Sequence, residues 1–396
     1  MSASLEGNTI FGLVETSALR SPKSTAIIDP EQGPMSYEEL EDQVRYTVRY
    51  LNGCGLFRND RVALILPNGA EMAAAFLGVS SCTTCAPINP QINAEELRFL
   101  LRDLKAEALV GSSVVDGRVW GVVDELGIKR IMLTPDTELA GRFRLGEGNS
   151  VDSGGVFASP GDTALILHTS GTTARPKMVP LTHVNLCVSA RNISKSLALT
   201  ANDLCLNVMP LFHIHGLVGC MLSNIAVGAA TIFSRGYQAG AFLDLLQALK
   251  PTWYSAVPSI HQSLIYFGRE RGYQVHHNLR FIRSCSAALP RSVMKDLESY
   301  FGVPVVEAYG MTEASHQIAV NPLPPKPRKP GSVGLASGVE VSIMSEGGHL
   351  QPAGDLGEVV IRGPTVTRGY EDNPEANATT FVDGWFKTGD LGYIDQ

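Results

Sequence analysis

The spacing of apolar residues along the first 330 residues predicts helices that alternate with short strands. Ser36 and Glu39 form a capping-box pattern, which predicts that a helix begins after Ser36. Apolar residues then recur at helical spacing from Leu40 to Leu51, and Gly53 ends the pattern. Further helices are predicted in residues 93–104, 241–249, 259–267 and 292–300. Short apolar runs predict strands in residues 62–66, 164–167, 204–208, 230–233, 252–257, 279–282 and 303–306.

Alternating strands and helices favour an α/β fold in which parallel sheets are covered by helices. The pattern changes at residues 321–330, which hold five prolines and predict a stiff, exposed loop. Short strand patterns separated by glycine turns follow in residues 339–344, 357–362 and 385–388. We therefore expect α/β layers in residues 1–330 and a small antiparallel β unit in residues 331–396.

Composition limits the class of protein. A chain of 396 residues, 44% hydrophobic and 18% charged, is typical of a soluble globular protein with more than one packed unit. Its net charge of −7 argues against general nucleic-acid binding. The chain opens with no signal-peptide pattern and contains no run of about eighteen apolar residues, so no membrane span is expected. We expect a cytoplasmic protein and leave a C-terminal peroxisomal address open.

Seven cysteines are scattered along the chain, mostly in apolar stretches. An odd, scattered set favours a reducing compartment and buried thiols rather than a disulfide framework. Cys82 and Cys85 form a C-x-x-C pair, but the second pair that a zinc site requires is missing. We therefore expect a structural role for these two thiols.

The segment LHTSGTTARPK, residues 167–177, is the clearest candidate for chemistry. It follows the apolar strand pattern of residues 164–167 and combines hydroxyl side chains, flexible backbone amides around Gly171 and the cation of Lys177. Amides in such a turn form a nest for oxygen anions, so the segment predicts a polyphosphate site. It is not a Walker P-loop, because Met178 stands where that motif requires a magnesium-binding Ser or Thr.

Two further segments, EAYGMTE at residues 307–313 and GWFKTGDLG at residues 384–392, complete a resemblance. Together with the Thr/Ser/Gly loop, and in the same order, they resemble the core motifs of the adenylate-forming superfamily. That superfamily includes acyl-CoA synthetases, adenylation domains of nonribosomal peptide synthetases and luciferases. The resemblance extends over nearly the whole chain and implies the large N-terminal domain of such an enzyme, with stacked, mostly parallel sheets.

The resemblance also implies a hinge and a small C-terminal domain beyond residue 396, which supply a lysine for adenylation. Because no residue of this chain takes that role, we expect residues 1–396 alone to bind ATP but to adenylate slowly.

The resemblance assigns roles in ATP binding to residues of these motifs. The β- and γ-phosphates would be held by Thr169, Ser170, Gly171, Thr172, Thr173 and Lys177. Glu313 would be the Mg²⁺ ligand, and Thr312 would bind the α-phosphate. Tyr309 would face the adenine and Asp390 would accept hydrogen bonds from the ribose. The nucleotide-binding set is completed by Ser286, Ala287, Ala288, Glu307, Ala308, Gly310 and Met311.

The acyl pocket is less well defined by the sequence. In the segment PLFHIHG, His213 is expected at the floor of the pocket and His215 is the second choice. Residues 279–290 and 311–334 resemble the oxalate–CoA ligase branch, which activates a very small dicarboxylate. A second carboxylate needs a cation or several donors, and the candidates are Arg283, Ser284, His213 and His316, with Gly310 also in the pocket.

The sequence thus predicts an AMP-forming acid–CoA ligase that uses ATP and Mg²⁺. It would convert a small, oxalate-like acid to an acyl-adenylate with release of pyrophosphate, and then form a thioester with CoA. Two alternatives remain at this stage: an adenylation domain that loads the pantetheine of a carrier protein, and a nucleotide- or acid-binding module without turnover. The identity of the acid, the acceptor and the oligomeric state stay open.

Overall fold

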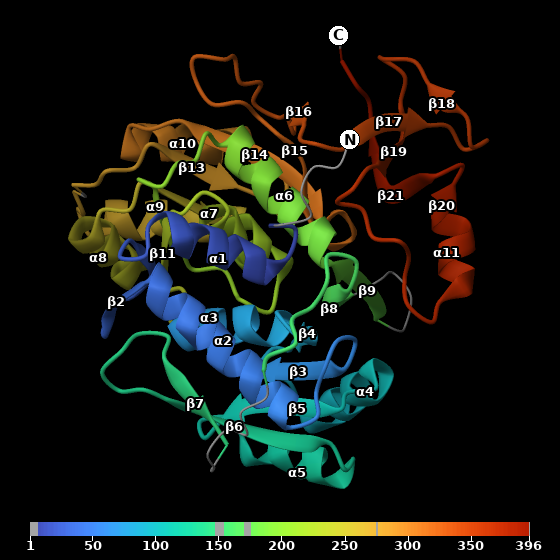
Figure 1. Cartoon of the computed structure of the whole chain (residues 1–396). Helices are drawn as coiled ribbons and strands as arrows, with labels where there is room; N and C mark the ends of the chain where they lie inside the picture. The colour runs from blue at the N-terminus through green and yellow to red at the C-terminus, as the bar shows by residue number, and fades with distance from the viewer. Residues whose placement is uncertain (1–6, 147–153, 170–175, 275, 396) are drawn as a thin grey trace.

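Two large β-sheets and one small sheet organise the chain in the computed structural model (Figure 1), which describes residues 7–146, 154–169, 176–274 and 276–395. The first sheet has nine strands, in the order β16 (Leu335–Ala336), β15 (His316–Val320), β14 (Val305–Met311), β13 (Phe281–Ser284), β12 (Trp253–Ala256), β10 (Leu204–Asn207), β11 (Ala230–Phe233), β1 (Thr25–Asp29) and β2 (Gly33–Ser36). The second has seven, in the order β7 (Phe143–Leu145), β6 (Lys129–Pro135), β5 (Ala108–Ser112), β3 (Arg61–Ile65), β4 (Thr84–Pro87), β8 (Thr163–Thr169) and β9 (Lys177–Thr182).

Both large sheets are parallel in their interior and antiparallel at their edges. In the nine-stranded sheet every pair from β1 to β14 is parallel, whereas β2, β15 and β16 are antiparallel to their neighbours. In the seven-stranded sheet only β7 and β9 are antiparallel to their neighbours. The predicted α/β fold with stacked, mostly parallel sheets is therefore confirmed.

Helices cover both faces of each large sheet. The covering helices are α1 (Ile10–Arg20), α2 (Tyr37–Gly53), α3 (Ala70–Ser80), α4 (Ala94–Leu104), α5 (Gly117–Glu125), α6 (His183–Ser196), α7 (Ser223–Ile225), α8 (Ala239–Leu249), α9 (Pro258–Glu270) and α10 (Arg291–Phe301), with a π-helix at His215–Leu222. The largest core lies between the two sheets and includes residues of α1, α2, α3, α6 and the π-helix. The outer face of the nine-stranded sheet packs on α8, α9 and α10, and that of the seven-stranded sheet packs on α4 and α5.

The third sheet is small and antiparallel, as predicted. Its order is β18 (Leu350–Gln351), β17 (Glu340–Met344), β19 (Gly357–Arg362), β21 (Trp385–Gly392) and β20 (Phe381–Val382). The short helix α11 (Pro374–Thr380) precedes β20. Residues 331–338, which we assigned to this unit, include β16, which pairs with β15 at the edge of the nine-stranded sheet. The sheet proper therefore begins at Glu340.

Local sequence signals explain several of these elements and mislead in two places. Helix α2 begins after Ser36 with both hydrogen bonds of the predicted capping box. Strand β13 lies two residues beyond the predicted run of residues 279–282, so Arg283 and Ser284 belong to the strand. Strand β14 runs on to Met311, so residues 307–311 extend the sheet where the sequence pattern predicts a strand that ends at residue 306.

The cysteines are buried as expected. All seven thiols are free; Cys54 is half-buried and the other six are buried, including Cys82 and Cys85. Among the described residues, no helix combines the length and the apolar character needed to cross a bilayer.

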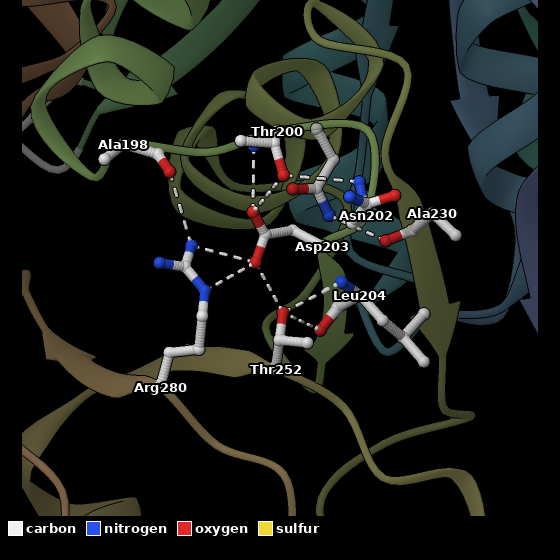
Figure 2. A network of polar contacts seen from close by, with 9 residues as sticks. Ala198, Thr200, Asn202, Asp203, Leu204, Ala230, Thr252 and Arg280 are labelled. Atoms are coloured by element: carbon white, nitrogen blue, oxygen red, sulfur yellow. Dashed lines mark hydrogen bonds and ion pairs between the residues drawn. The ribbon is translucent and has the colours of Figure 1, made fainter.

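One buried carboxylate ties together the amino-terminal ends of three parallel strands (Figure 2). Asp203, which precedes β10, is 4% exposed and accepts hydrogen bonds from Thr252 Oγ1 (2.7 Å), before β12, and Arg280 Nε (2.9 Å), before β13. It also accepts the backbone N–H of Thr200 (2.8 Å). Ligands of α/β sheets bind at the opposite, carboxyl-terminal ends of the strands, so this network has a structural role.

We expect Asp203→Ala to lower the free energy of unfolding by about 2 kcal/mol, because it removes the buried acceptor of the Thr252 hydroxyl, the Thr200 amide and the Arg280 guanidinium. Urea unfolding measures this loss. Arg280→Met is the milder control, since both threonine donors remain. The substrate dependence of either variant should match that of the unmodified protein; a changed Michaelis constant for any substrate contradicts the structural role.

Candidate active site

A buried cation lies near the carboxyl-terminal ends of β12 and β13. The side chain of Arg283 on β13 is 0% exposed. Its Nη1 donates to Ser255 Oγ (3.1 Å), and its Nη2 donates to His316 Nε2 (3.1 Å) and Gln317 Oε1 (2.9 Å). Its Nε has no hydrogen-bond partner among the residues that the structure describes. Within the described part of the chain no carboxylate pairs with this guanidinium, so its positive charge is uncompensated.

Two buried histidines with stacked rings lie beside this cation. The rings of His215 and His316 lie with their centroids 4.9 Å apart. His215 Nε2 lies 2.6 Å from Ser255 Oγ, and its Nδ1 lies 3.0 Å from Ser286 Oγ. Burial, together with the charge of Arg283, holds the pKa of both imidazoles well below its usual range, so both rings are neutral at pH 7.

The fixed donor Arg283 gives this hydrogen-bonded chain a direction. Because the guanidinium can only donate, Ser255 Oγ accepts from it and is left to donate its proton to Nε2 of His215. The remaining N–H of His215 then donates to Ser286, whose hydroxyl is on an exposed loop. Ser286 is thereby placed to donate its own proton outwards, with the buried positive charge behind it.

Arg283, Ser255, His215, His316 and Ser286 form one polar cluster, and the backbone around this cluster has unusual conformations. Ser286, Ser315 and His316 have positive φ angles of 71°, 52° and 97°, which side-chain-bearing residues seldom adopt. Two glycines leave room for His316: a Cβ on Gly219 would lie 2.5 Å from its Nε2, and one on Gly310 would lie 1.7 Å from its carbonyl oxygen. Such strain persists where surrounding structure enforces it, and it gathers at functional sites.

Two residues predicted for the acyl pocket lie outside the cluster. Ser284 follows Arg283 directly, so strand alternation turns its side chain to the opposite face, that of Ile282 in the outer core. There its hydroxyl is buried, and no described residue forms a hydrogen bond with it. The structure therefore does not bring Ser284 together with Arg283, and a role of Ser284 in the acyl pocket stays a prediction.

His213 is exposed, and its ring contacts that of Phe212. It is His215, our second choice, that the π-helix brings to the cluster. A role of His213 in the acyl pocket stays a prediction.

A second group of polar residues surrounds Glu313, in the short 3-10 helix Thr312–Ala314 after β14. This carboxylate is 6% exposed and accepts a hydrogen bond from Tyr370 Oη at 2.9 Å. The ring of Tyr370 also lies under the ammonium of Lys177, with Nζ 4.6 Å from the ring centroid. Thr312 is half-buried beside Glu313. The structure thus brings Lys177 of one predicted motif together with Thr312 and Glu313 of another.

The predicted phosphate loop lies largely outside the described residues. Ser170, Gly171, Thr172 and Thr173 belong to that part, so their phosphate-binding role stays a prediction. The structure describes the two ends of the segment: Thr169 ends β8 and Lys177 begins β9, and they pair across this antiparallel hairpin.

The adenine- and ribose-binding candidates come from three segments. Tyr309 on β14 donates a hydrogen bond to Asp390 on β21, at 2.5 Å, so these two predicted residues are neighbours. Buried Glu307 accepts the backbone N–H of Leu289 at 3.0 Å and so ties β14 to the loop after β13. That loop exposes Ser286, Ala287 and Ala288. Ala308, Gly310 and Met311 complete β14.

The residues present suit a magnesium nucleotide. Glu313 is buried, and within the described chain its carboxylate forms no ion pair and no side-chain hydrogen bond other than that from Tyr370. The described residues contain no group of three or more His, Cys, Asp or Glu that could hold a metal by themselves. Mg²⁺ commonly uses one or two carboxylates and completes its shell with phosphate oxygens and water, so a single buried carboxylate fits.

Comparison with known proteins agrees with this geometry. The chain belongs to the AMP-binding enzyme family, whose model matches residues 14–371. It is similar to the oxalate–CoA ligase of Arabidopsis thaliana, with 40% identity over 99% of this chain and 78% of that protein. It is also similar to the oxalate–CoA ligase of Saccharomyces cerevisiae, with 38% identity over 94% of this chain and 74% of that protein.

Solved structures support the same assignment. An ATP-bound MatB from Rhodopseudomonas palustris has a TM-score of 0.86 and 27% identity, and the match covers 98% of this chain and 77% of that one. The predicted adenylate-forming superfamily and the prediction of an enzyme of the AMP-forming acid–CoA ligase type are confirmed.

Proposed function

We propose that this protein activates a short dicarboxylic acid, of which oxalate is the type, by adenylation with Mg·ATP and transfers the acyl group to CoA. The observation that carries the choice of acid is the uncompensated charge of Arg283, buried among neutral partners at the end of the parallel strands. A second carboxylate at this end of the site would supply the missing negative charge. The similarity to two oxalate–CoA ligases supports the same choice.

The chemistry requires two anions to meet, since a carboxylate attacks the α-phosphorus of ATP and pyrophosphate leaves. In the proposed site Lys177 contributes a positive charge at the base of the phosphate loop, and Thr312 contributes a hydrogen-bond donor near the α-phosphate. A magnesium ion held by Glu313 supplies charge neutralisation on the phosphates. Asp390 accepts hydrogen bonds from the ribose, and Tyr309 offers its ring to the adenine. The directed hydroxyl of Ser286 and the charge of Arg283 behind it orient the acid.

Product analysis on the full-length protein tests whether CoA is the acceptor of the acyl group. With ATP, Mg²⁺, oxalate and CoA, we expect equal amounts of AMP and oxalyl-CoA, identified by mass spectrometry. AMP formation that depends on a carrier protein and not on CoA would contradict the proposed acceptor. ATP binding without AMP formation under any of these conditions would contradict the enzyme assignment.

The two histidines of the PLFHIHG segment give a further prediction. We expect His215→Phe to raise the apparent Michaelis constant for the acid about tenfold and that for ATP less than twofold, because it breaks the link between Arg283 and Ser286. His213→Phe is the comparison, because the sequence favours His213 for the acyl pocket whereas the structure places His215 beside Arg283. Steady-state kinetics with both substrates checks this. A larger effect of His213→Phe than of His215→Phe would contradict the assignment of the cluster.

A further inference from the structure

Tyr370 contacts two oppositely charged residues of the proposed site and belongs to none of the three motifs. It lies in the loop between β19 and α11 and is 7% exposed. Its hydroxyl donates to Glu313 Oε1 at 2.9 Å, while its ring lies 4.6 Å from Lys177 Nζ. We infer that Tyr370 is a positioning residue that holds the magnesium-binding carboxylate and the phosphate-binding ammonium apart and in place. This inference rests on the proposed function.

The backbone of Tyr370 is fixed by a paired hydrogen bond. Asn377, in α11, accepts the N–H of Tyr370 through Oδ1 at 2.7 Å and donates to its carbonyl through Nδ2 at 2.8 Å. The next residue, Glu371, donates its N–H to the carbonyl of Met178 at 3.0 Å. The tyrosine is therefore held against the strand that begins with Lys177.

The same loop is attached to Glu313. Thr367 donates its N–H to the carbonyl of Glu313 at 2.7 Å and its hydroxyl to the carbonyl of Pro180 at 2.8 Å. On the other side of Tyr370, Glu371 pairs with Arg61 of β3. The loop thus contacts the backbones of both elements whose charges its tyrosine meets, so the phenol and its partners are placed together by the fold and not by side-chain contact alone.

The geometry of the phenol assigns a separate task to each of its parts. Its hydroxyl, protonated near neutral pH, occupies Oε1 of Glu313, and within the described chain no side chain hydrogen-bonds to Oε2. Its ring face attracts the ammonium of Lys177 without neutralising it. No ion pair joins Lys177 to Glu313 among the described residues. Both charges therefore stay available, one for a cation and one for phosphate, whereas a direct salt bridge would satisfy each with the other.

Two substitutions separate these tasks. Tyr370→Phe keeps the ring and removes the hydroxyl, so only the hold on Glu313 is lost. We expect the magnesium concentration for half-maximal pyrophosphate exchange to rise about tenfold, with the Michaelis constant for the acid within twofold. Tyr370→Leu also removes the ring, and we expect it to weaken metal-free ATP binding about threefold in addition, measured by calorimetry. Tyr266→Phe, at a side chain that is 70% exposed, is the control.

Calorimetry of ATP with and without Mg²⁺ decides the inference without requiring turnover. The inference predicts that Tyr370→Phe lowers the gain in ATP affinity on adding Mg²⁺ and leaves metal-free ATP affinity unchanged. An unchanged gain overturns it, and so does a loss of ATP affinity that is equal with and without the metal, because a merely structural role would produce that. If the unmodified protein binds Mg·ATP but none of the tested acids supports pyrophosphate exchange, the proposed function fails. The calorimetric comparison still tests the role of Tyr370 in that case.

Discussion

Glu313→Gln is expected to lower the rate of ATP–pyrophosphate exchange by about two orders of magnitude or more while changing ATP affinity by less than about tenfold. The substitution keeps the shape of the side chain and removes the buried negative charge that no described cation compensates. The metal neutralises pyrophosphate most as it leaves, so the loss falls on the chemical step more than on binding. Exchange kinetics and calorimetry on the same preparations measure the two quantities.

The control for this prediction is Glu346→Gln, the same chemical change at an exposed position in the turn between β17 and β18. It should leave both exchange and ATP affinity unaltered. Exchange by Glu313→Gln within about threefold of the unmodified rate would place the metal ligand elsewhere. A comparable loss in both variants would mean that the measurement responds to overall charge and not to the site.

The second large effect concerns the choice of acid. Arg283→Met replaces the buried cation by an apolar side chain of similar length, and we expect the ratio of kcat/KM for oxalate to that for acetate to fall by about two orders of magnitude. A site built around a buried charge rejects a neutral isostere, because its own polar groups are left unpaired. Without the charge, that discrimination disappears. Paired measurements with the two acids give the ratio directly.

Arg280→Met is the matched control, because Arg280 lies three residues earlier in the chain, directly before the amino-terminal end of β13. It should lower stability and leave the ratio unchanged. If Arg283→Met keeps the preference for oxalate and loses only stability, the buried arginine has a structural role and the proposed acid loses its main support.

Much of the fold was predictable because local signals and tertiary packing agree. Helix α2 carries both its cap and its apolar stripe, and the short apolar runs of the parallel strands stand out from the helices between them. Helix α3 has no apolar stripe of this kind, because almost all of its residues are buried. Without a polar face, the sequence lacks the helical periodicity that would have predicted this helix. The π-helix at His215–Leu222 is likewise buried on every side, and its apolar run gave no sign of its geometry.

The candidate site was predictable where its residues stand in continuous motifs, and less so where they meet across the fold. Ser255 lies opposite Arg283 in the register of two neighbouring strands, which requires the strand order. Tyr370 reaches Glu313 across 57 residues of sequence. The sequence contains no local pattern that links either pair. The choice between His213 and His215 depended on which of the two the π-helix turns inwards, and that is a property of the packed structure.

The central claim is that the chain adenylates a carboxylate and prefers a short dicarboxylate, and one measurement tests it most directly. ATP–pyrophosphate exchange is measured on the full-length protein, with and without Mg²⁺. The panel of acids contains oxalate, malonate, acetate, benzoate, a long-chain fatty acid and an α-amino acid. The account predicts magnesium-dependent exchange that is fastest with oxalate or malonate and at least about tenfold slower with acetate. Fastest exchange with the fatty acid, benzoate or the amino acid would contradict the assigned substrate, and exchange with none of them would contradict adenylation itself.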